Sequence, residues 1–359
     1  MKTDGVNEGL EGVVVSATRL SSVDGERGQL IIAGHDVEAL GGKATFEDVI
    51  ALLRDGVLPG SGRREALRAR LGAARATAYS ALRPVTLDAD DAMSALRAGV
   101  SQLRTEDEDV VIGAVAVIAA AWTRLRAGLP IVPPDPSLSH ASDFLRMTTG
   151  RDAEPARVAA LDAYLVTVAD HGLNASTFAA RVVASTGSDL VSSIVAAIGA
   201  LKGPLHGGAP GPVLDMLDAI GTPEGASSWL ETELSAGRRI MGMGHRIYRV
   251  RDPRAAVLER ATRRLEASGA TSGRLSLAHA VEQAAVGALR DRHPTRPLAA
   301  NVEFYTAVLL DAVGLPRELF AAVFAVSRVA GWCAHVAEQR AGGRLIRPAS
   351  IYIGPAVSA

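Results

Sequence analysis

The sequence predicts a mainly α-helical protein. Long stretches carry apolar residues at every third or fourth position, which is the pattern of a helix with one buried face. Hydrophobic residues make up 48% of the chain but aromatic residues only 4%, so aliphatic side chains must fill the core, and these suit close helix packing. Strand signals are confined to two short segments near the N-terminus.

Six segments show the helical period most clearly. In the first of them, Phe46, Ile50 and Leu53 would share one face. Thr45 and Asp189 precede two of the segments and are suitable N-cap residues, because their side-chain oxygens can accept hydrogen bonds from free backbone N–H groups. The six predicted helices cover residues 44–58, 63–76, 90–103, 155–169, 190–202 and 317–339.

A small β-hairpin is predicted near the N-terminus. Residues 12–17 and 29–33 are short and β-rich, and residues 21–28 would form the turn between them. Further along the chain, breaks rich in glycine and proline bracket the helical stretch 212–315. That stretch is predicted to be a small inserted domain, which leaves residues 1–211 and 316–359 as the large domain.

Composition excludes several classes of protein. Lys and Arg number 38 and Asp and Glu 39, so the net charge of −1 gives no overall attraction to nucleic acid or anionic membranes. The single cysteine, Cys333, cannot form an intramolecular disulfide and is expected to be buried and inert. The N-terminus lacks the apolar stretch of a signal peptide, and the longest apolar run, residues 110–122, is shorter than the ~20 residues of a membrane span. A core helix and a cytoplasmic protein are therefore expected.

The histidines show no spacing typical of a metal site, so none is expected. His206 stands between Pro204 and a pair of glycines, shortly before a predicted helix. A histidine at a helix N-terminus has its pKa lowered and favours the neutral form, which can donate a hydrogen bond. Taken alone, the residue could equally cap a turn.

A second histidine, His245, follows Gly242 and Gly244 and precedes several arginines. No predicted strand comes before these glycines, which disfavours a dinucleotide-binding fingerprint. The arginines could form a solvated face or bind a polyanion, since guanidinium groups match carboxylates and phosphates. Glu303 and His171, each taken alone, could be structural residues.

The joint occurrence of these segments resembles the citrate synthase family. The similarity runs from Gly9 to Gly354, nearly the whole chain, and its short matches occur in the family's order. The matching segments are residues 9–13, 24–25, 170–178, 203–209, 242–248, 252–254, 301–305, 327–328, 331–332 and 347–348.

The resemblance implies a dimeric, mostly helical acyltransferase with its active site between the two domains and no cofactor besides the acyl-CoA substrate. His206 would donate a hydrogen bond to the thioester oxygen of acetyl-CoA, Glu303 would take a proton from its methyl group, and His245 would protonate the new alkoxide. The large domain would carry the dimer interface and the oxaloacetate side, and the small domain the CoA side. Residues implied for oxaloacetate are His171, Arg254, Arg328 and, from the other subunit, Arg347; those implied for CoA are Met241, Gly242, Met243, Gly244 and Arg296.

The chain departs from the family pattern at several positions. Glu303 replaces the family's catalytic aspartate and is one methylene longer. The other departures are Ala33, His35, Gly172, Pro210, Ala299 and Ala300. Three hypotheses follow: synthesis of citrate, a related reaction such as 2-methylcitrate synthesis from propionyl-CoA or condensation of another acyl-CoA or keto acid, or a catalytically weak relative that acts as a binding protein.

Overall fold

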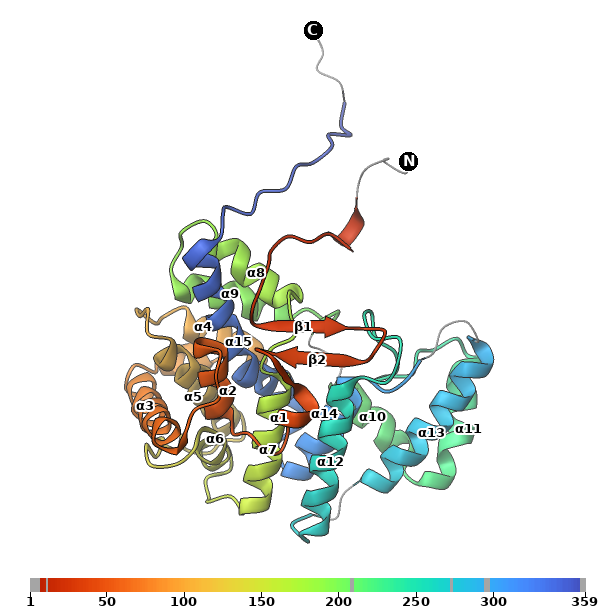
Figure 1. The fold of residues 1–359 in the computed structure, drawn as a ribbon. Coiled ribbons are helices and arrows are strands. Elements are labelled where there is room, and N and C mark those ends of the chain that lie inside the picture. The colour runs from red at the N-terminus through yellow and green to blue at the C-terminus, as the bar shows by residue number, and fades with distance from the viewer. Residues whose placement is uncertain (1–6, 11, 207–209, 272–273, 294–297, 356–359) are drawn as a thin grey trace.

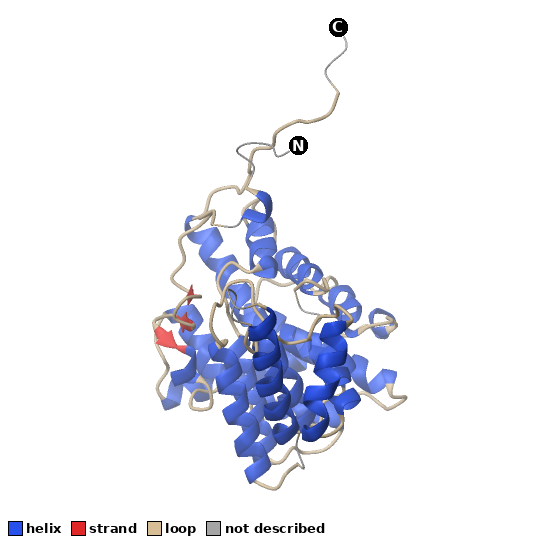
Figure 2. Cartoon of the chain, turned by 90° about the vertical axis from the view of Figure 1, so that its right-hand side faces the viewer, coloured by secondary structure: helices blue, strands red, loops and turns tan. Residues whose placement is uncertain are grey.

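The computed structural model describes residues 7–10, 12–206, 210–271, 274–293 and 298–355. This part of the chain is mostly helical, with a small sheet at one edge of the body (Figures 1 and 2). Its α-helices are α1 (Val37–Leu40), α2 (Phe46–Asp55), α3 (Ser61–Ser80), α4 (Ala92–Val100), α5 (Glu108–Arg126), α6 (His140–Thr149), α7 (Pro155–Val168), α8 (Ala175–Ala184), α9 (Leu190–Leu201), α10 (Pro210–Ile220), α11 (Ala226–Ser235), α12 (Pro253–Ala267), α13 (Leu275–Arg292), α14 (Val302–Val313) and α15 (Phe320–Gly342).

The six helices predicted from periodicity are confirmed as α2, α3, α4, α7, α9 and α15. Their ends follow from side-chain caps. Thr45 accepts a hydrogen bond from the backbone N–H of Asp48, whose carboxylate accepts one from the backbone of Thr45 in return. Asp189 caps α9 through the backbone N–H of Ser192. These caps satisfy N–H groups that have no partner within their own helix.

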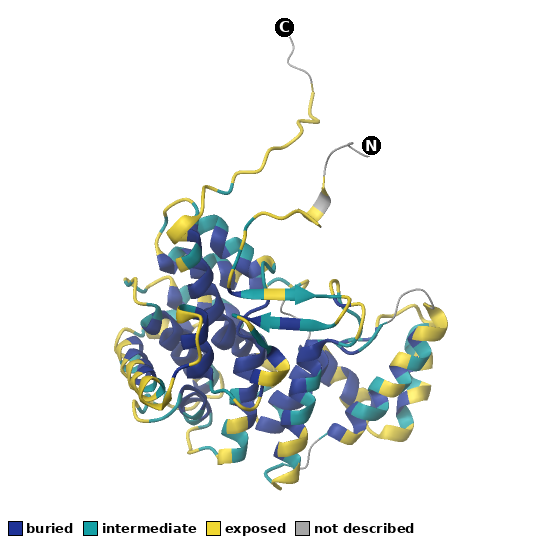
Figure 3. Ribbon diagram, in the orientation of Figure 1, coloured by how far each residue is buried: buried dark blue, intermediate teal, exposed yellow. Residues whose placement is uncertain are grey.

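The predicted hairpin exists, but its first strand was placed wrongly. Strand β1 is Ser21–Asp24, and it pairs antiparallel with β2 (Gln29–Ile32) through a turn at residues 25–28. A third strand, β3 (His35–Asp36), extends the sheet. Residues 12–17, predicted as a strand, instead lead from the N-terminus toward the body as an extended, mostly exposed segment (Figure 3).

Helices α5 and α15 form the centre of the core. The apolar run of residues 110–122 is almost wholly buried in α5, as predicted. Among the described residues one segment, Arg317–Gly342, is long and apolar enough to cross a membrane, but 94% of its apolar window is buried inside the fold. It is a core helix, and it packs against α5, α8, α9 and α7. Cys333 lies on it and is buried, as expected.

The helices of the predicted small domain have two kinds of surroundings. Helices α11 and α13 pack together and form one side of the molecule in Figure 1. Helices α12 and α14 pack on each other and also on α7, which belongs to the predicted large domain. The site described below lies where these groups of helices meet, and the division into two domains stays a prediction.

Candidate active site

Side chains from distant parts of the chain meet at the loop that precedes α12. His171 follows α7, whereas His245 and Tyr248 lie in the loop itself and Arg254 lies in the first turn of α12. The centroids of the two imidazole rings are 5.8 Å apart. The Tyr248 ring lies 5.7 Å from that of His171 and 4.8 Å from that of His245, with Arg254 5.8 Å from its centroid. The predicted grouping of His171, His245 and Arg254 is therefore present.

His245 has a defined tautomer. Its Nδ1 accepts hydrogen bonds from the backbone N–H groups of Ile247 at 3.0 Å and Tyr248 at 3.1 Å, so the ring proton belongs on Nε2. Burial, and then the nearby Arg254, lowers the pKa of His245 to about 4, which keeps the ring neutral. Nε2 lies 3.4 Å from Nη2 of Arg254. Two donors so close together can share one acceptor, such as a keto oxygen or an alkoxide.

His206 carries its proton on the other nitrogen. Its Nε2 accepts from the backbone N–H of Ser176 at 3.2 Å and lies 2.8 Å from the hydroxyl of the same serine. The indole N–H of Trp332 donates to that hydroxyl at 3.1 Å. The Ser176 hydroxyl donates its own proton to Oδ1 of Asn174 at 2.8 Å, so the backbone N–H of Ser176 is the group that makes Nε2 an acceptor. Nδ1 then carries the hydrogen and remains available as a donor. The pKa of His206 is lowered to about 4, and burial rather than the helix terminus is its largest cause, followed by Arg328.

Arg254 and Arg328 are both buried. Arg254 donates to the carboxylate of Asp252, which also accepts from the backbone N–H of Val302 at the start of α14. Arg328, on α15, donates from Nε to the carbonyl of Val168 at 2.7 Å, while its Nη2 is buried without a hydrogen-bond partner among the described residues. Burial lowers the pKa of Arg328 to about 10. A buried guanidinium with a free N–H suits an anionic ligand.

Glu303 lies in the first turn of α14. Asn301 caps this helix by accepting from the backbone N–H of Glu303, and its amide donates to the carbonyl of Gly244 at 2.8 Å. The Glu303 Oε2 atom is buried without a hydrogen-bond partner in the described part of the chain. Burial raises the pKa of Glu303 to about 7, although Arg254 and Arg328 act in the opposite direction. A carboxylate with this pKa is suited to act as a base near neutral pH.

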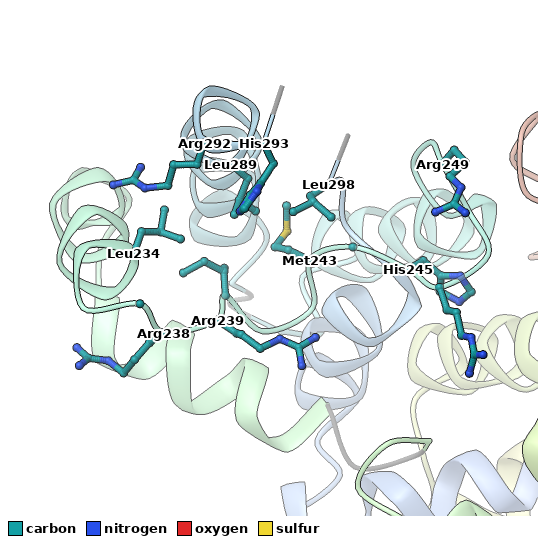
Figure 4. Close-up of a pocket in the computed structure, with 14 residues that line it drawn as sticks. Leu234, Arg238, Arg239, Met243, His245, Arg249, Leu289, Arg292, His293 and Leu298 are labelled. Carbon is teal, nitrogen blue, oxygen red and sulfur yellow. The ribbon is translucent and has the colours of Figure 1, made fainter. Parts of the chain in front are cut away.

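A pocket of about 650 Å³ opens beside His245. Figure 4 shows its wall, which comes from the end of α11, the end of α13 and the loop between α11 and α12. Met243 and Gly244, two of the predicted CoA residues, line this pocket. Its basic lining residues include Arg238, Arg239, Arg249, Arg292 and His293, and its apolar ones Leu234, Leu289 and Leu298.

Two other predicted CoA residues, Met241 and Gly242, are not among the residues that line this pocket. Gly242 has a left-handed backbone with φ of 74°, and a Cβ there would lie 2.9 Å from that of Phe304, so this glycine permits close packing against α14. Arg296 lies outside the described residues.

Arg347 is not near the other predicted oxaloacetate residues of its own chain. It is exposed on the extended C-terminal segment, in a groove that it shares with Val13 and Phe178. Figure 1 shows this segment leaving the body on the same side as the N-terminus. The groove around Arg347 includes none of His171, Arg254 and Arg328 of its own chain.

The turn between β1 and β2 lies against the His245 loop. The backbone N–H of Arg249 donates to the carbonyl of Gly25 at 2.9 Å. A Cβ at Gly25 would lie only 2.3 Å from the carbonyl oxygen of Ile247, so only glycine allows the two backbones to approach so closely. Sequence reasoning missed the roles of Gly25, Tyr248 and Ser176, although all three lie inside the family-like segments.

Comparison with known proteins identifies the family of this chain. A family model described as "Citrate synthase, C-terminal domain" matches residues 9–349. The citrate synthase of Haloferax volcanii is 38% identical over 97% of this chain and 96% of its own, and that of Deinococcus radiodurans is 37% identical over 97% and 96%.

Solved structures give the same result. The crystal structure of citrate synthase from Thermotoga maritima matches 99% of this chain and 97% of its own, with a TM-score of 0.85 and 34% identity. The citrate synthase of Thermoplasma acidophilum, solved as a ternary complex with carboxymethyl coenzyme A and oxaloacetate, matches 99% and 98% with a TM-score of 0.87 and 30% identity. The chain therefore belongs to the citrate synthase family of acyltransferases.

Proposed function

We propose that this protein condenses oxaloacetate with acetyl-CoA, and that water then releases citrate and CoA. The observation that supports this most strongly is the pair of neutral histidines with opposite tautomers. His206 offers an N–H from Nδ1 and His245 one from Nε2. Arg328 acts on His206 and Arg254 acts on His245, and both of these buried arginines also act on Glu303, a carboxylate that can act as a base. A carbon acid as weak as a thioester needs such a base together with a donor for the developing oxyanion.

In the first step Glu303 removes a proton from the methyl group of acetyl-CoA. The electron pair of the C–H bond moves onto the thioester oxygen, which accepts a hydrogen bond from Nδ1 of His206. A neutral imidazole suits this role, because its N–H stabilises the developing charge without requiring a buried cation beside Arg328.

In the second step the nucleophilic carbon attacks the keto carbon of oxaloacetate. His245 delivers its Nε2 proton to the new alkoxide, and Arg254, 3.4 Å from that nitrogen, stabilises the charge as it forms. Water then adds to the thioester carbonyl of citryl-CoA, and the thiol of CoA leaves. The proton that Glu303 gained returns through solvent to His245, which restores both groups. The overall conversion is acetyl-CoA, oxaloacetate and water to citrate, CoA and one proton.

The substrates also suit the charges of the site. We propose that Arg254, Arg328 and His171 hold the two carboxylates of oxaloacetate, and that a partner subunit supplies Arg347 in a homodimer. The pocket beside Met243 and Gly244 would hold CoA, whose phosphates suit its arginines. We also propose that the protein is located in the cytoplasm.

The test is thiol release from acyl-CoA by the purified protein, with and without oxaloacetate. Acetyl-CoA and propionyl-CoA are compared, because one methylene changes discrimination by only ~1–3 kcal/mol, and mass spectrometry then identifies citrate or 2-methylcitrate. We expect release that requires oxaloacetate and falls by about 10²–10⁴-fold in His245→Ala. Binding of both ligands without release from either thioester would contradict a synthase and favour a binding protein.

A further inference from the structure

We propose that Tyr248 is a positioning residue that holds both His171 and His245 in the tautomers that the oxaloacetate site requires. The inference rests on the proposed function, which supplies oxaloacetate as the substrate. The tautomers of the two histidines can be tested without any substrate. Tyr248 lies in the loop before α12, and its side chain is only 3% exposed.

The backbone of Tyr248 acts on His245. Its N–H donates to Nδ1 of His245 at 3.1 Å, beside the bond of 3.0 Å from Ile247. With two donors on Nδ1, the imidazole proton must lie on Nε2. The tyrosine ring packs on the His245 ring, with centroids 4.8 Å apart, which restricts rotation of the imidazole.

The side chain of Tyr248 acts on His171. Its hydroxyl lies 3.0 Å from Nε2 of His171. Burial raises the pKa of Tyr248, so the phenol stays protonated and needs an acceptor. The described residues give this hydroxyl no other hydrogen-bond partner, and Nε2 of His171 therefore accepts its proton.

The consequence for His171 is a proton on Nδ1. This ring is neutral, because burial and then the nearby Arg254 and Arg328 lower its pKa well below the usual range. A neutral imidazole has one N–H, and the bond from Tyr248 leaves this N–H on the nitrogen that faces away from the phenol. His171 can then donate to an anion rather than accept from a cation, which is what a carboxylate ligand needs.

Tyr248 thus helps to fix which nitrogen carries the proton in two histidines that come from different parts of the chain. His171 follows α7, whereas His245 belongs to the loop that the β1–β2 turn contacts through Gly25. The two donors are fixed before the substrate binds, so binding costs less conformational entropy of these side chains. Loss of the phenol oxygen should therefore weaken recognition of the keto diacid and leave recognition of the acyl-CoA unchanged.

The first experiment compares Tyr248→Phe with the parent protein in steady-state kinetics. The ring stays and the hydroxyl is lost, so the KM for oxaloacetate should rise about 3- to 10-fold, the scale of one net hydrogen bond, with the KM for acetyl-CoA unchanged. Thr148→Val is the matched control, because it removes a buried hydroxyl from α6, which bonds only within its own helix. The control should leave both KM values unchanged.

The second experiment reads the tautomers by ¹⁵N NMR of histidine-labelled protein without substrate. His171 should show Nε2 unprotonated in the parent and a mixture of tautomers in Tyr248→Phe, with the resonance assigned by its loss in His171→Ala. This result is independent of turnover, so it separates failure of this inference from failure of the proposed function.

Two results would overturn the inference. One is a His171 ring that keeps a single tautomer in Tyr248→Phe. The other is an equal rise of the oxaloacetate KM when Tyr248→Phe is added to His171→Ala, because a residue that acts through His171 must lose its effect in that background.

Discussion

Asp252 accepts a hydrogen bond from Nη2 of Arg254 at 2.7 Å through the same oxygen, Oδ2, that accepts one from the backbone N–H of Val302 at 3.2 Å. One carboxylate therefore connects a substrate arginine to the first turn of α14, where Glu303 lies. The position of the base and the position of the anion site are linked through this single side chain.

We expect Asp252→Asn to raise the KM for oxaloacetate about 10- to 100-fold, the range for hydrogen bonds to charged groups. The amide keeps an oxygen that can accept from Val302, but it removes the charge that pairs with the buried Arg254. Steady-state kinetics measure the change, and thermal unfolding shows whether the variant is folded. A folded variant with an unchanged KM would mean that Arg254 does not depend on Asp252 for its position.

The contact between Gly25 and the His245 loop gives a second prediction. In Gly25→Ala the new Cβ would meet the carbonyl oxygen of Ile247 at 2.3 Å, so the loop must move. A shift of ~1 Å at a catalytic group costs on the order of 10²-fold, so kcat should fall by about 10- to 100-fold. Gly60→Ala is the control, because Gly60 has an ordinary φ of −69° and no atom within 4 Å of an added Cβ. Equal kcat values in the two variants would show that the turn does not position His245.

Glu303 should also make stability depend on pH. Its folded pKa of about 7 lies above the ordinary value of 4.5, so the protonated form is favoured on folding. This contribution is fully present below about pH 4.5 and is lost as pH rises through 7. Glu303→Gln should therefore be more stable than the parent by about 1–3 kcal/mol at pH 8 and no more stable at pH 4, as measured by denaturant unfolding. A gain that is the same at both pH values would argue against a raised pKa.

The proposed dimer predicts complementation. Arg347→Ala removes the arginine supplied to the neighbour, and His245→Ala removes the acid within its own chain. Each variant alone should be nearly inactive, whereas mixed dimers should recover one of their two sites. Activity is measured after the two proteins are unfolded and refolded together. No recovery, with mixed dimers shown by differently tagged subunits, would place Arg347 in the site of its own chain.

Periodicity and cap residues made most of the fold predictable. Thr45 and Asp189 begin helices, as their side chains suggested. The first strand was misplaced because β-rich composition indicates an extended backbone but not a pairing partner. Val14, for example, is 89% exposed, while the less apolar Ser21–Asp24 forms the strand because its turn lets it pair with β2.

The sequence allowed prediction only of those site residues that stand in short motifs. His206, His245 and Glu303 stand in such motifs, and so do the arginines. The tautomers, in contrast, depend on contacts between segments far apart in sequence. Ser176 contacts His206, and Tyr248 contacts His171, only in the folded chain. The spacing of these residues in the sequence does not predict either contact.

The most direct test of the proposed chemistry is the kcat for oxaloacetate-dependent thiol release by the parent, Glu303→Asp and Glu303→Gln. Glu303 reaches roughly one C–C bond farther than aspartate, and catalytic groups tolerate only ~0.5 Å of misplacement. If the surrounding residues fit the longer side chain, Glu303→Asp should lower kcat and Glu303→Gln should nearly abolish it. A markedly faster Glu303→Asp would show a weakened enzyme, and full activity in Glu303→Gln would show that Glu303 is not the base.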